Sequence, residues 1–90
     1  MSQPPIVMYA TASCPYCVAA RSLLQSKGVR WTEVPVDVQS GKRAEMMQRS
    51  GRHTVPQIFI GDIHVGGFDD LSLLERRGEL DGLLGGGSQA

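Results

Sequence analysis

The feature that most constrains this chain is a pair of cysteines three positions apart, in Cys14-Pro15-Tyr16-Cys17, and the 90-residue sequence has no others. The pair lies between a short apolar run, Ile6 to Ala10, and a segment of helical character, Val18 to Lys27. A Cys-x-x-Cys pair between a strand and a helix is typical of a redox-active dithiol. The unpaired N–H groups and the dipole of a helix start favour the thiolate form of cysteine. Because proline suits the first helical position, we expect Cys14 at the N-cap and Cys17 in the first turn. One thiol can then attack and the other can resolve.

Two other uses of the cysteine pair fit the sequence less well. A structural zinc site needs four ligands, and the remaining candidates, His53 and His64, do not stand at the short spacing of paired zinc histidines. A structural disulfide between residues three apart closes a loop too short to constrain the unfolded chain much. We therefore expect no metal and interpret the pair as catalytic.

Length and composition predict one small domain. Hydrophobic residues make up 41% of the sequence and charged residues 20%, which is ordinary for a soluble globular protein. The formal net charge is zero, which gives no reason to expect nucleic acid or an anionic membrane as a partner. We expect the domain to span residues 1–84, the Gly-rich segment 85–90 to be a flexible tail, and the protein to be a monomer.

The N-terminal sequence bears on localisation. Residues 1–11 contain no Lys or Arg, and their apolar run is too short for a signal peptide or a membrane span. We therefore expect a cytoplasmic protein. Thiols are kept reduced in that compartment, where a cysteine pair is more often catalytic than structural.

The hydrophobic pattern predicts strands and helices in the order β-α-β-α-β-β-α, followed by a short last helix. Strands are expected at 6–10, 31–36, 57–60 and 63–65, and helices at 18–27 with a first turn at Pro15, at 41–50, after 66–70, and at 80–84. The first strand–helix–strand unit predicts a parallel pair, and Gly61-Asp62 predicts a tight antiparallel hairpin. Pro35 cannot donate a backbone hydrogen bond, so strand 31–36 is expected at an edge. Met46 and Met47 in the second helix are interpreted as core residues.

Three motifs resemble the signatures of the dithiol glutaredoxins: Cys14-Pro15-Tyr16-Cys17, Thr54-Val55-Pro56 and Gly66-Gly67-Phe68-Asp69-Asp70. The resemblance runs from about Ile6 to Leu84 and is close to small bacterial class I members. It implies an α/β, thioredoxin-like (glutaredoxin) fold with a four-stranded mixed sheet flanked by helices. It also implies a cis peptide bond before Pro56, where the rarity of cis X–Pro bonds would by itself favour trans.

The resemblance further implies glutathione-dependent thiol–disulfide exchange, with glutathione as co-substrate. Cys14 would attack protein disulfides and glutathione mixed disulfides as the thiolate, and Cys17 would resolve. The residues implied to bind the tripeptide are Tyr16 at its flank, Thr54, Val55 and Pro56 at its cysteinyl part, and Gly67, Phe68 and Asp69 at its γ-glutamyl end. A helix N-terminus suits the carboxylate of that end and Asp69 suits its ammonium group. Asp69 and Asp70 can also be simple helix caps.

One position departs from the family pattern. Members usually carry a lysine three residues before the first cysteine, where this sequence has Thr11. Such a lysine would lower the thiol pKa and contact the glycyl carboxylate of glutathione. Arg43, at a position where the family often has a polar or basic ligand, and Arg52 are the candidates for part of that duty. We expect Cys14 to depend mainly on the helix N-terminus.

Two other functions stay open at the level of sequence. A glutaredoxin-like dimer can hold a [2Fe–2S] cluster with two Cys14 thiolates and two glutathiones, but Pro15-Tyr16 differs from the Cys-Gly-Phe-Ser motif of the usual cluster carriers. A thioredoxin-type reductant would be served by a reductase instead of glutathione, but the sequence lacks the Trp-Cys-Gly-Pro-Cys motif.

Overall fold

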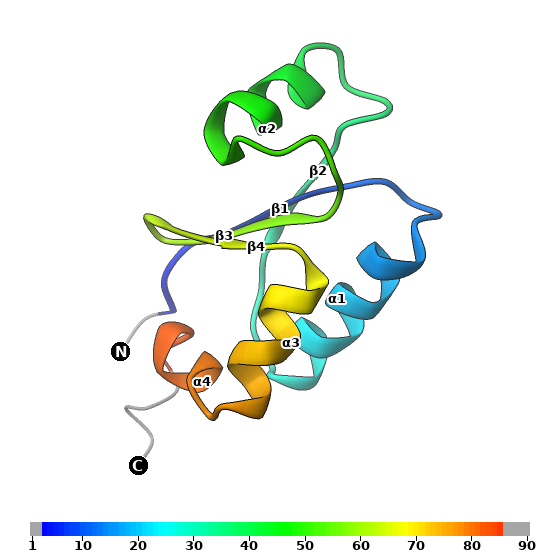
Figure 1. Ribbon diagram of the computed structural model, residues 1–90. Coiled ribbons are helices and arrows are strands. Elements are labelled where there is room, and N and C mark those ends of the chain that lie inside the picture. Colours follow the sequence, from blue (N-terminus) through cyan, green and yellow to red (C-terminus); the bar gives the residue numbers. More distant parts are fainter. Residues whose placement is uncertain (1–2, 86–90) are drawn as a thin grey trace.

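The computed structural model describes residues 3–85, which form a four-stranded mixed sheet with helices on both faces (Figure 1). The strands are β1 (Ile6–Ala10), β2 (Thr32–Pro35), β3 (Gln57–Ile60) and β4 (Ile63–Gly66). The helices are α1 (Pro15–Ser26), α2 (Lys42–Ser50), α3 (Phe68–Arg76) and α4 (Leu80–Leu83). Helix α2 covers one face of the sheet, and α1, α3 and α4 cover the other (Figure 1). The expected tail falls almost wholly on residues 86–90, outside the described part of the chain.

The sheet confirms the predicted connectivity. Its order is β2-β1-β3-β4, with β1 parallel to β2 and antiparallel to β3, and with β3 and β4 as an antiparallel hairpin. Strand β2 stands at an edge, as predicted from the missing N–H of Pro35. Strand β3 lies between β1 and β4, and all four of its residues are buried.

Helix α1 begins where the cysteine motif predicts. Cys14 is the N-cap, with an extended backbone (φ −70°, ψ 123°), and Pro15 is the first helical residue. Proline costs no helical hydrogen bond at that position. Because β1 ends at Ala10, a loop of three residues, 11–13, separates the cysteine motif from the end of a central strand.

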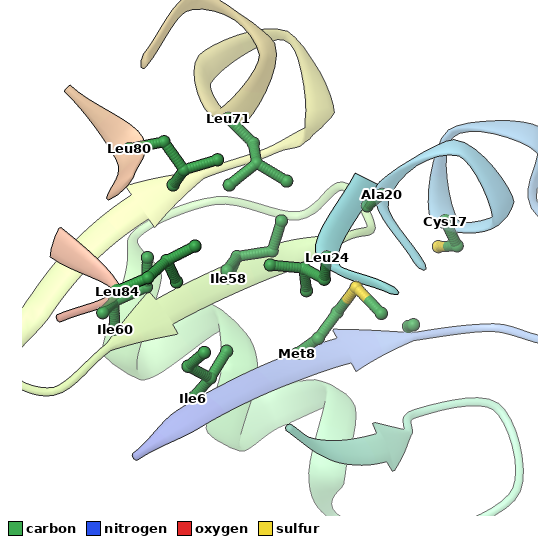
Figure 2. Packing of buried hydrophobic residues seen from close by; sticks show 11 residues of the cluster. Ile6, Met8, Cys17, Ala20, Leu24, Ile58, Ile60, Leu71, Leu80 and Leu84 are labelled. Carbon is green, nitrogen blue, oxygen red and sulfur yellow. The ribbon is translucent and has the colours of Figure 1, made fainter. Parts of the chain in front are cut away.

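The main hydrophobic core lies between the sheet and the α1, α3 and α4 layer (Figure 2). Its buried residues come from two strands and three helices: Ile6, Met8, Ala10, Cys17, Ala20, Leu24, Ile58, Ile60, Leu71, Leu80 and Leu84. Fully burying one large aliphatic side chain contributes about 1.5–3 kcal/mol. This packing therefore holds α1, and with it the cysteine motif, against the sheet.

A smaller cluster lies under α2. It consists of four buried residues, Tyr9, Val36, Met46 and Phe59, with Met47 partly buried beside them. Both methionines therefore pack as core residues, as predicted. No helix within residues 3–85 has the length and apolar character needed to cross a membrane.

Candidate active site

The two cysteines lie in different surroundings at the start of α1. Both are free thiols; Cys14 is half-buried and Cys17 is fully buried in the main core. The Cys14 Sγ atom lies 3.8 Å from the carbonyl oxygen of Val55. Val55 precedes Pro56, and their peptide bond is cis, as the resemblance implies. The cysteine motif and the Thr54-Val55-Pro56 motif are thus adjacent in space.

These surroundings push the two thiol pKa values apart. Burial opposes ionisation of Cys14, but the N–H and S–H groups of Cys17 and the N–H of Tyr16 favour the thiolate, so the pKa of Cys14 lies below its ordinary value. Burial, opposed by the N–H of Thr11 and reinforced by the charge on Cys14, raises the pKa of Cys17 to about 11. At neutral pH Cys14 is therefore the thiol that ionises, and Cys17 stays protonated beside it. Among the causes that lower the pKa of Cys14, the N–H of Cys17 at the helix start is the largest, which agrees with the expected dependence on the helix N-terminus.

Arg21 adds a positive charge that sequence reasoning did not identify. Its Nη2 atom donates to the carbonyl oxygen of Thr11 at 3.0 Å, and its Nε atom donates to both Glu33 carboxylate oxygens at 2.9 Å. Nη2 also forms an ion pair with Glu33. The charge of Arg21 contributes, after burial and the hydrogen bonds, to lowering the pKa of Cys14. The guanidinium therefore ties α1 to β2 and to the loop before Cys14, and it supplies a cation close to the thiols.

A groove of about 300 Å³ begins beside Val55. It is lined by nine residues from all three motifs and from the segment that follows α2: Tyr16, Arg52, Thr54, Val55, Pro56, Gly67, Phe68, Asp69 and Asp70. The sequence-predicted site residues of the second and third motifs all line it, as does Tyr16. The N–H of Val55 faces no acceptor in residues 3–85.

Asp70 and Arg52 form one wall of the groove. The Asp70 Oδ2 atom accepts a hydrogen bond from the Gly67 N–H at 3.0 Å and from Arg52 Nη1 at 3.0 Å. Arg52, and after it the Gly67 N–H, hold the pKa of Asp70 below its usual range. Gly66 has φ 114°, and a Cβ atom there would collide with the Asp70 carboxylate and lie 3.0 Å from Arg52 Nη1. Glycine is therefore required at 66 for this wall to close.

Asp69, next to Asp70, is chemically different. It is exposed, it lines the groove, and its carboxylate makes no hydrogen bond or ion pair with the described residues. The capping role considered for both aspartates thus belongs to Asp70, and Asp69 is available to a ligand. A free carboxylate beside the N–H groups of a helix start offers a ligand both an acceptor for a cation and donors for an anion.

The structure leaves two predicted site residues away from this groove. Thr11 is half-buried and engaged by Arg21, and Arg43 is exposed on α2; neither lines the groove. Within residues 3–85 no three His, Cys, Asp or Glu side chains gather as metal ligands would.

Comparison with known proteins identifies the family to which this fold belongs. A family model described as glutaredoxin matches residues 6–65, which contain the cysteine motif and the Thr54-Val55-Pro56 motif. This chain belongs to the glutaredoxin family. It is 56% identical over 81 residues to a glutaredoxin of Pseudomonas aeruginosa, covering 90% of this chain and 96% of that one. It is 54% identical over 79 residues to glutaredoxin 3 of Escherichia coli, covering 88% and 95%.

Solved glutaredoxins share the architecture. A solution structure from Brucella melitensis superposes with a TM-score of 0.83 at 48% identity, covering 97% of this glutaredoxin and 95% of that chain. A crystal structure of a buckwheat glutaredoxin–glutathione complex gives a TM-score of 0.83 at 33% identity, covering 90% and 76%. The fold is therefore thioredoxin-like, and the site is that of a thiol–disulfide oxidoreductase.

Proposed function

We propose that this glutaredoxin uses glutathione to reduce glutathione mixed disulfides and protein disulfides. The observation that carries the proposal is the course of the groove, which starts beside the Cys14 sulfur at Val55 and ends at the unpaired carboxylate of Asp69. A γ-glutamyl group carries an ammonium and a carboxylate on one carbon. Asp69 suits the ammonium, and the N–H groups at the start of α3 suit the carboxylate. The related buckwheat glutaredoxin was solved in complex with glutathione, which supports glutathione as the ligand of this groove.

Reduction of a mixed disulfide needs only Cys14. Its thiolate attacks the glutathione sulfur, the substrate leaves as a thiolate that takes up a proton, and a Cys14–glutathione disulfide forms. A second glutathione thiolate then attacks the glutathione sulfur of that disulfide. Glutathione disulfide leaves, and the Cys14 thiolate is restored.

Reduction of a protein disulfide also uses Cys17. The Cys14 thiolate attacks one sulfur of the substrate disulfide, and the other sulfur leaves as a thiolate that takes up a proton. Cys17 then attacks Cys14 Sγ, which releases the remaining substrate sulfur as a thiolate and leaves a Cys14–Cys17 disulfide. Two glutathione molecules reduce that bond. After burial, the charge on Cys14 is among the causes that raise the pKa of Cys17 to about 11. That charge disappears once Cys14 is in a disulfide, so Cys17 becomes easier to ionise at the step that needs it.

The test is a coupled assay with the mixed disulfide of glutathione and 2-mercaptoethanol. NADPH consumption is measured with glutathione and glutathione reductase, and separately with thioredoxin reductase. We expect turnover only in the first arm. Turnover with thioredoxin reductase alone, or a brown dimeric protein on purification, would instead support the thioredoxin-type or the cluster-binding alternative.

Four variants assign the residues. Cys14→Ser should abolish both activities, whereas Cys17→Ser should retain mixed-disulfide reduction and lose protein-disulfide reduction. Asp69→Asn should raise the KM for the mixed disulfide about tenfold or more, because a hydrogen bond to a charged group contributes about 1.5–3 kcal/mol. Asp62→Asn, at an exposed hairpin position with no described partner, is its matched control. A KM that changes equally in both aspartate variants would remove Asp69 from the binding site.

A further inference from the structure

Gln57 is the only buried polar residue within residues 3–85, with 0% of its surface exposed. It is the first residue of β3 and directly follows Pro56. Burying an amide costs free energy unless its donors and acceptor are all paired. An aliphatic side chain would fill the same space without that requirement. The contacts of this amide therefore indicate what it does.

The hydrogen bonds of Gln57 fix the orientation of its amide group. Gln57 Nε2 donates to the Thr54 carbonyl oxygen at 3.0 Å and lies 3.2 Å from Thr54 Oγ1. A backbone carbonyl can only accept, so the NH2 group must face Thr54 and the Oε1 atom must face His64. His64 Nε2 lies 2.7 Å from Oε1 and must therefore carry the hydrogen. Burial, followed by the charge of Arg52, lowers the pKa of His64, so near pH 7 the ring is neutral and protonated at Nε2.

Packing holds His64 in this orientation. His64 stands opposite Phe59 in the β3–β4 pair, and their rings stack with centroids 4.8 Å apart at 29°. The guanidinium of Arg49, from α2, lies 4.2 Å from the centre of the Phe59 ring. The donor that faces Gln57 is thus fixed by contacts from β3 and α2.

The Thr54 carbonyl and the Val55 N–H belong to one peptide group. The bond between them is trans, since the single cis bond of the described chain is the next one. In a planar trans peptide the C=O and N–H bonds point in opposite directions. Because the Thr54 carbonyl oxygen faces the buried Gln57 amide, the Val55 N–H points away from Gln57, and Val55 itself lines the groove.

We propose that Gln57, held by His64, is a positioning residue that orients the Thr54–Val55 peptide group so that the Val55 N–H is presented to the substrate beside Cys14. This inference rests on the proposed function, because it concerns how that same groove takes the cysteinyl part of glutathione. The proposal makes a residue outside the groove lining important for binding. Gln57 has no contact with the ligand, but its hydrogen bond to the Thr54 carbonyl influences the affinity of the groove.

The test compares Gln57→Met, which keeps the length of the side chain and removes its donor and acceptor, with Gln48→Met on the exposed surface of α2. The coupled assay with the glutathione–2-mercaptoethanol mixed disulfide gives kcat and KM. We expect Gln57→Met to raise KM about fivefold to tenfold, the factor associated with one net hydrogen bond, and Gln48→Met to change nothing. Iodoacetamide alkylation of Cys14 against pH should give the same profile in wild type and both variants, because the thiol contacts are unchanged.

A second readout follows the peptide group itself. In ¹⁵N-labelled protein, addition of S-methylglutathione should shift the Val55 amide resonance of the wild type and shift it much less in Gln57→Met. His64→Phe keeps the ring stacked on Phe59 and removes the donor, so it should raise KM by a smaller factor. His64→Phe serves as the test variant if Gln57→Met does not fold.

The outcomes separate this inference from the proposed function. A wild-type protein that does not turn over with glutathione contradicts the function. A wild type that turns over, with a Gln57→Met variant that is less stable but has an unchanged KM and an unchanged Val55 response, overturns the positioning role of Gln57 alone.

Discussion

The two faces of the sheet are packed with different chemistry. Under α1, α3 and α4 the buried side chains are all apolar or thiol groups. Under α2 the cluster contains Tyr9, whose hydroxyl is fully buried yet donates to Glu45 Oε2 at 2.6 Å and accepts from Arg49 Nη1 at 2.7 Å. The first face excludes water, whereas the second connects charged groups on α2 to the interior.

This difference matches a division of tasks at the site. The apolar face holds α1 and α3, whose N-termini carry Cys14 and Asp69. The polar face holds Arg49 against Phe59, and Phe59 against His64, next to the loop that contains Val55. Thiol activation therefore depends on rigid helix placement, and the shape of the binding loop depends on polar contacts.

The largest expected effect is on the apolar face. Leu24→Ala removes a fully buried side chain from the main core, and we expect a loss of about 3–5 kcal/mol in the free energy of unfolding. Met46→Ala, equally buried on the other face, should cost nearer 2 kcal/mol, because the nine-residue α2 can shift to fill the space. Urea unfolding of both variants measures the two losses in free energy of unfolding. Equal losses would contradict the expected difference in packing between the two faces.

A smaller effect is expected from the polar face. Tyr9→Phe removes two hydrogen bonds to charged groups, each of which contributes about 1.5–3 kcal/mol at most, because Glu45 and Arg49 can both reach water once the hydroxyl is gone. The Tyr9 hydroxyl, and after it Lys42, hold the pKa of Glu45 below its usual value. That stabilisation is present above the unfolded pKa of a glutamate and is lost as pH falls through the folded one.

Unfolding experiments between neutral and acid pH should therefore show a shallower acid loss in Tyr9→Phe than in the wild type. Tyr16→Phe is the control, because the Tyr16 side chain is 60% exposed and its hydroxyl has no partner in the described chain. An unchanged acid dependence in Tyr9→Phe would show that the Tyr9–Glu45 hydrogen bond does not contribute to the pH dependence of stability.

A third prediction separates the arginines of the two faces. Arg21→Gln should raise the pKa of Cys14 and slow its iodoacetamide alkylation at neutral pH by a factor of about two to five, the span of a partly exposed charge interaction. Arg49→Gln should leave that rate unchanged. Mass spectrometry of the alkylated protein assigns the modified thiol; Cys17, with a pKa of about 11, should react only at high pH. Equal rates in both variants would exclude Arg21 from thiol activation.

The smallest effect is expected from a lysine introduced at position 11. Thr11→Lys should lower the pKa of Cys14 further, but less than Arg21→Gln raises it, because Arg21 already supplies positive charge there. The alkylation rate against pH, compared with Thr11→Gln, measures this. Identical profiles for the two substitutions would mean that charge at position 11 does not reach the thiol.

Local signals explain what could be predicted from the sequence. Pro15 defines the start of α1, Gly51 (φ 71°) ends α2, and Pro35 places β2 at an edge, because each of these residues restricts its own backbone. Most residues that line the groove were predicted from motifs that resemble those of a known family. None of these predictions required knowledge of which side chains meet across the fold.

The features that sequence reasoning missed depend on contacts between side chains that are far apart in the sequence. In the sequence Arg21 is an ordinary helical cation. Only the structure shows that the parallel β1–β2 pair places Glu33 against it. In the sequence both Asp69 and Asp70 can be helix caps, and only the structure shows that Arg52 and the Gly67 N–H both bind the Asp70 carboxylate. Gln57, as a polar residue at a strand start, gives no sign of burial until β3 is found at the centre of the sheet. Arg43 was expected at the site, but α2 leaves it exposed and outside the groove lining.

The edge strand β2 has a consequence for self-association. Its four residues include Pro35, so it offers at most three backbone N–H donors to a strand of another molecule. Exposed strand edges recruit one another into larger sheets and fibrils, and proteins resist this with short edges, proline and charge. β2 combines all three, because Glu33 places a carboxylate on the same strand. Glu33, which holds Arg21 beside the loop 11–13, is therefore also one of the features that disfavour strand pairing at the β2 edge.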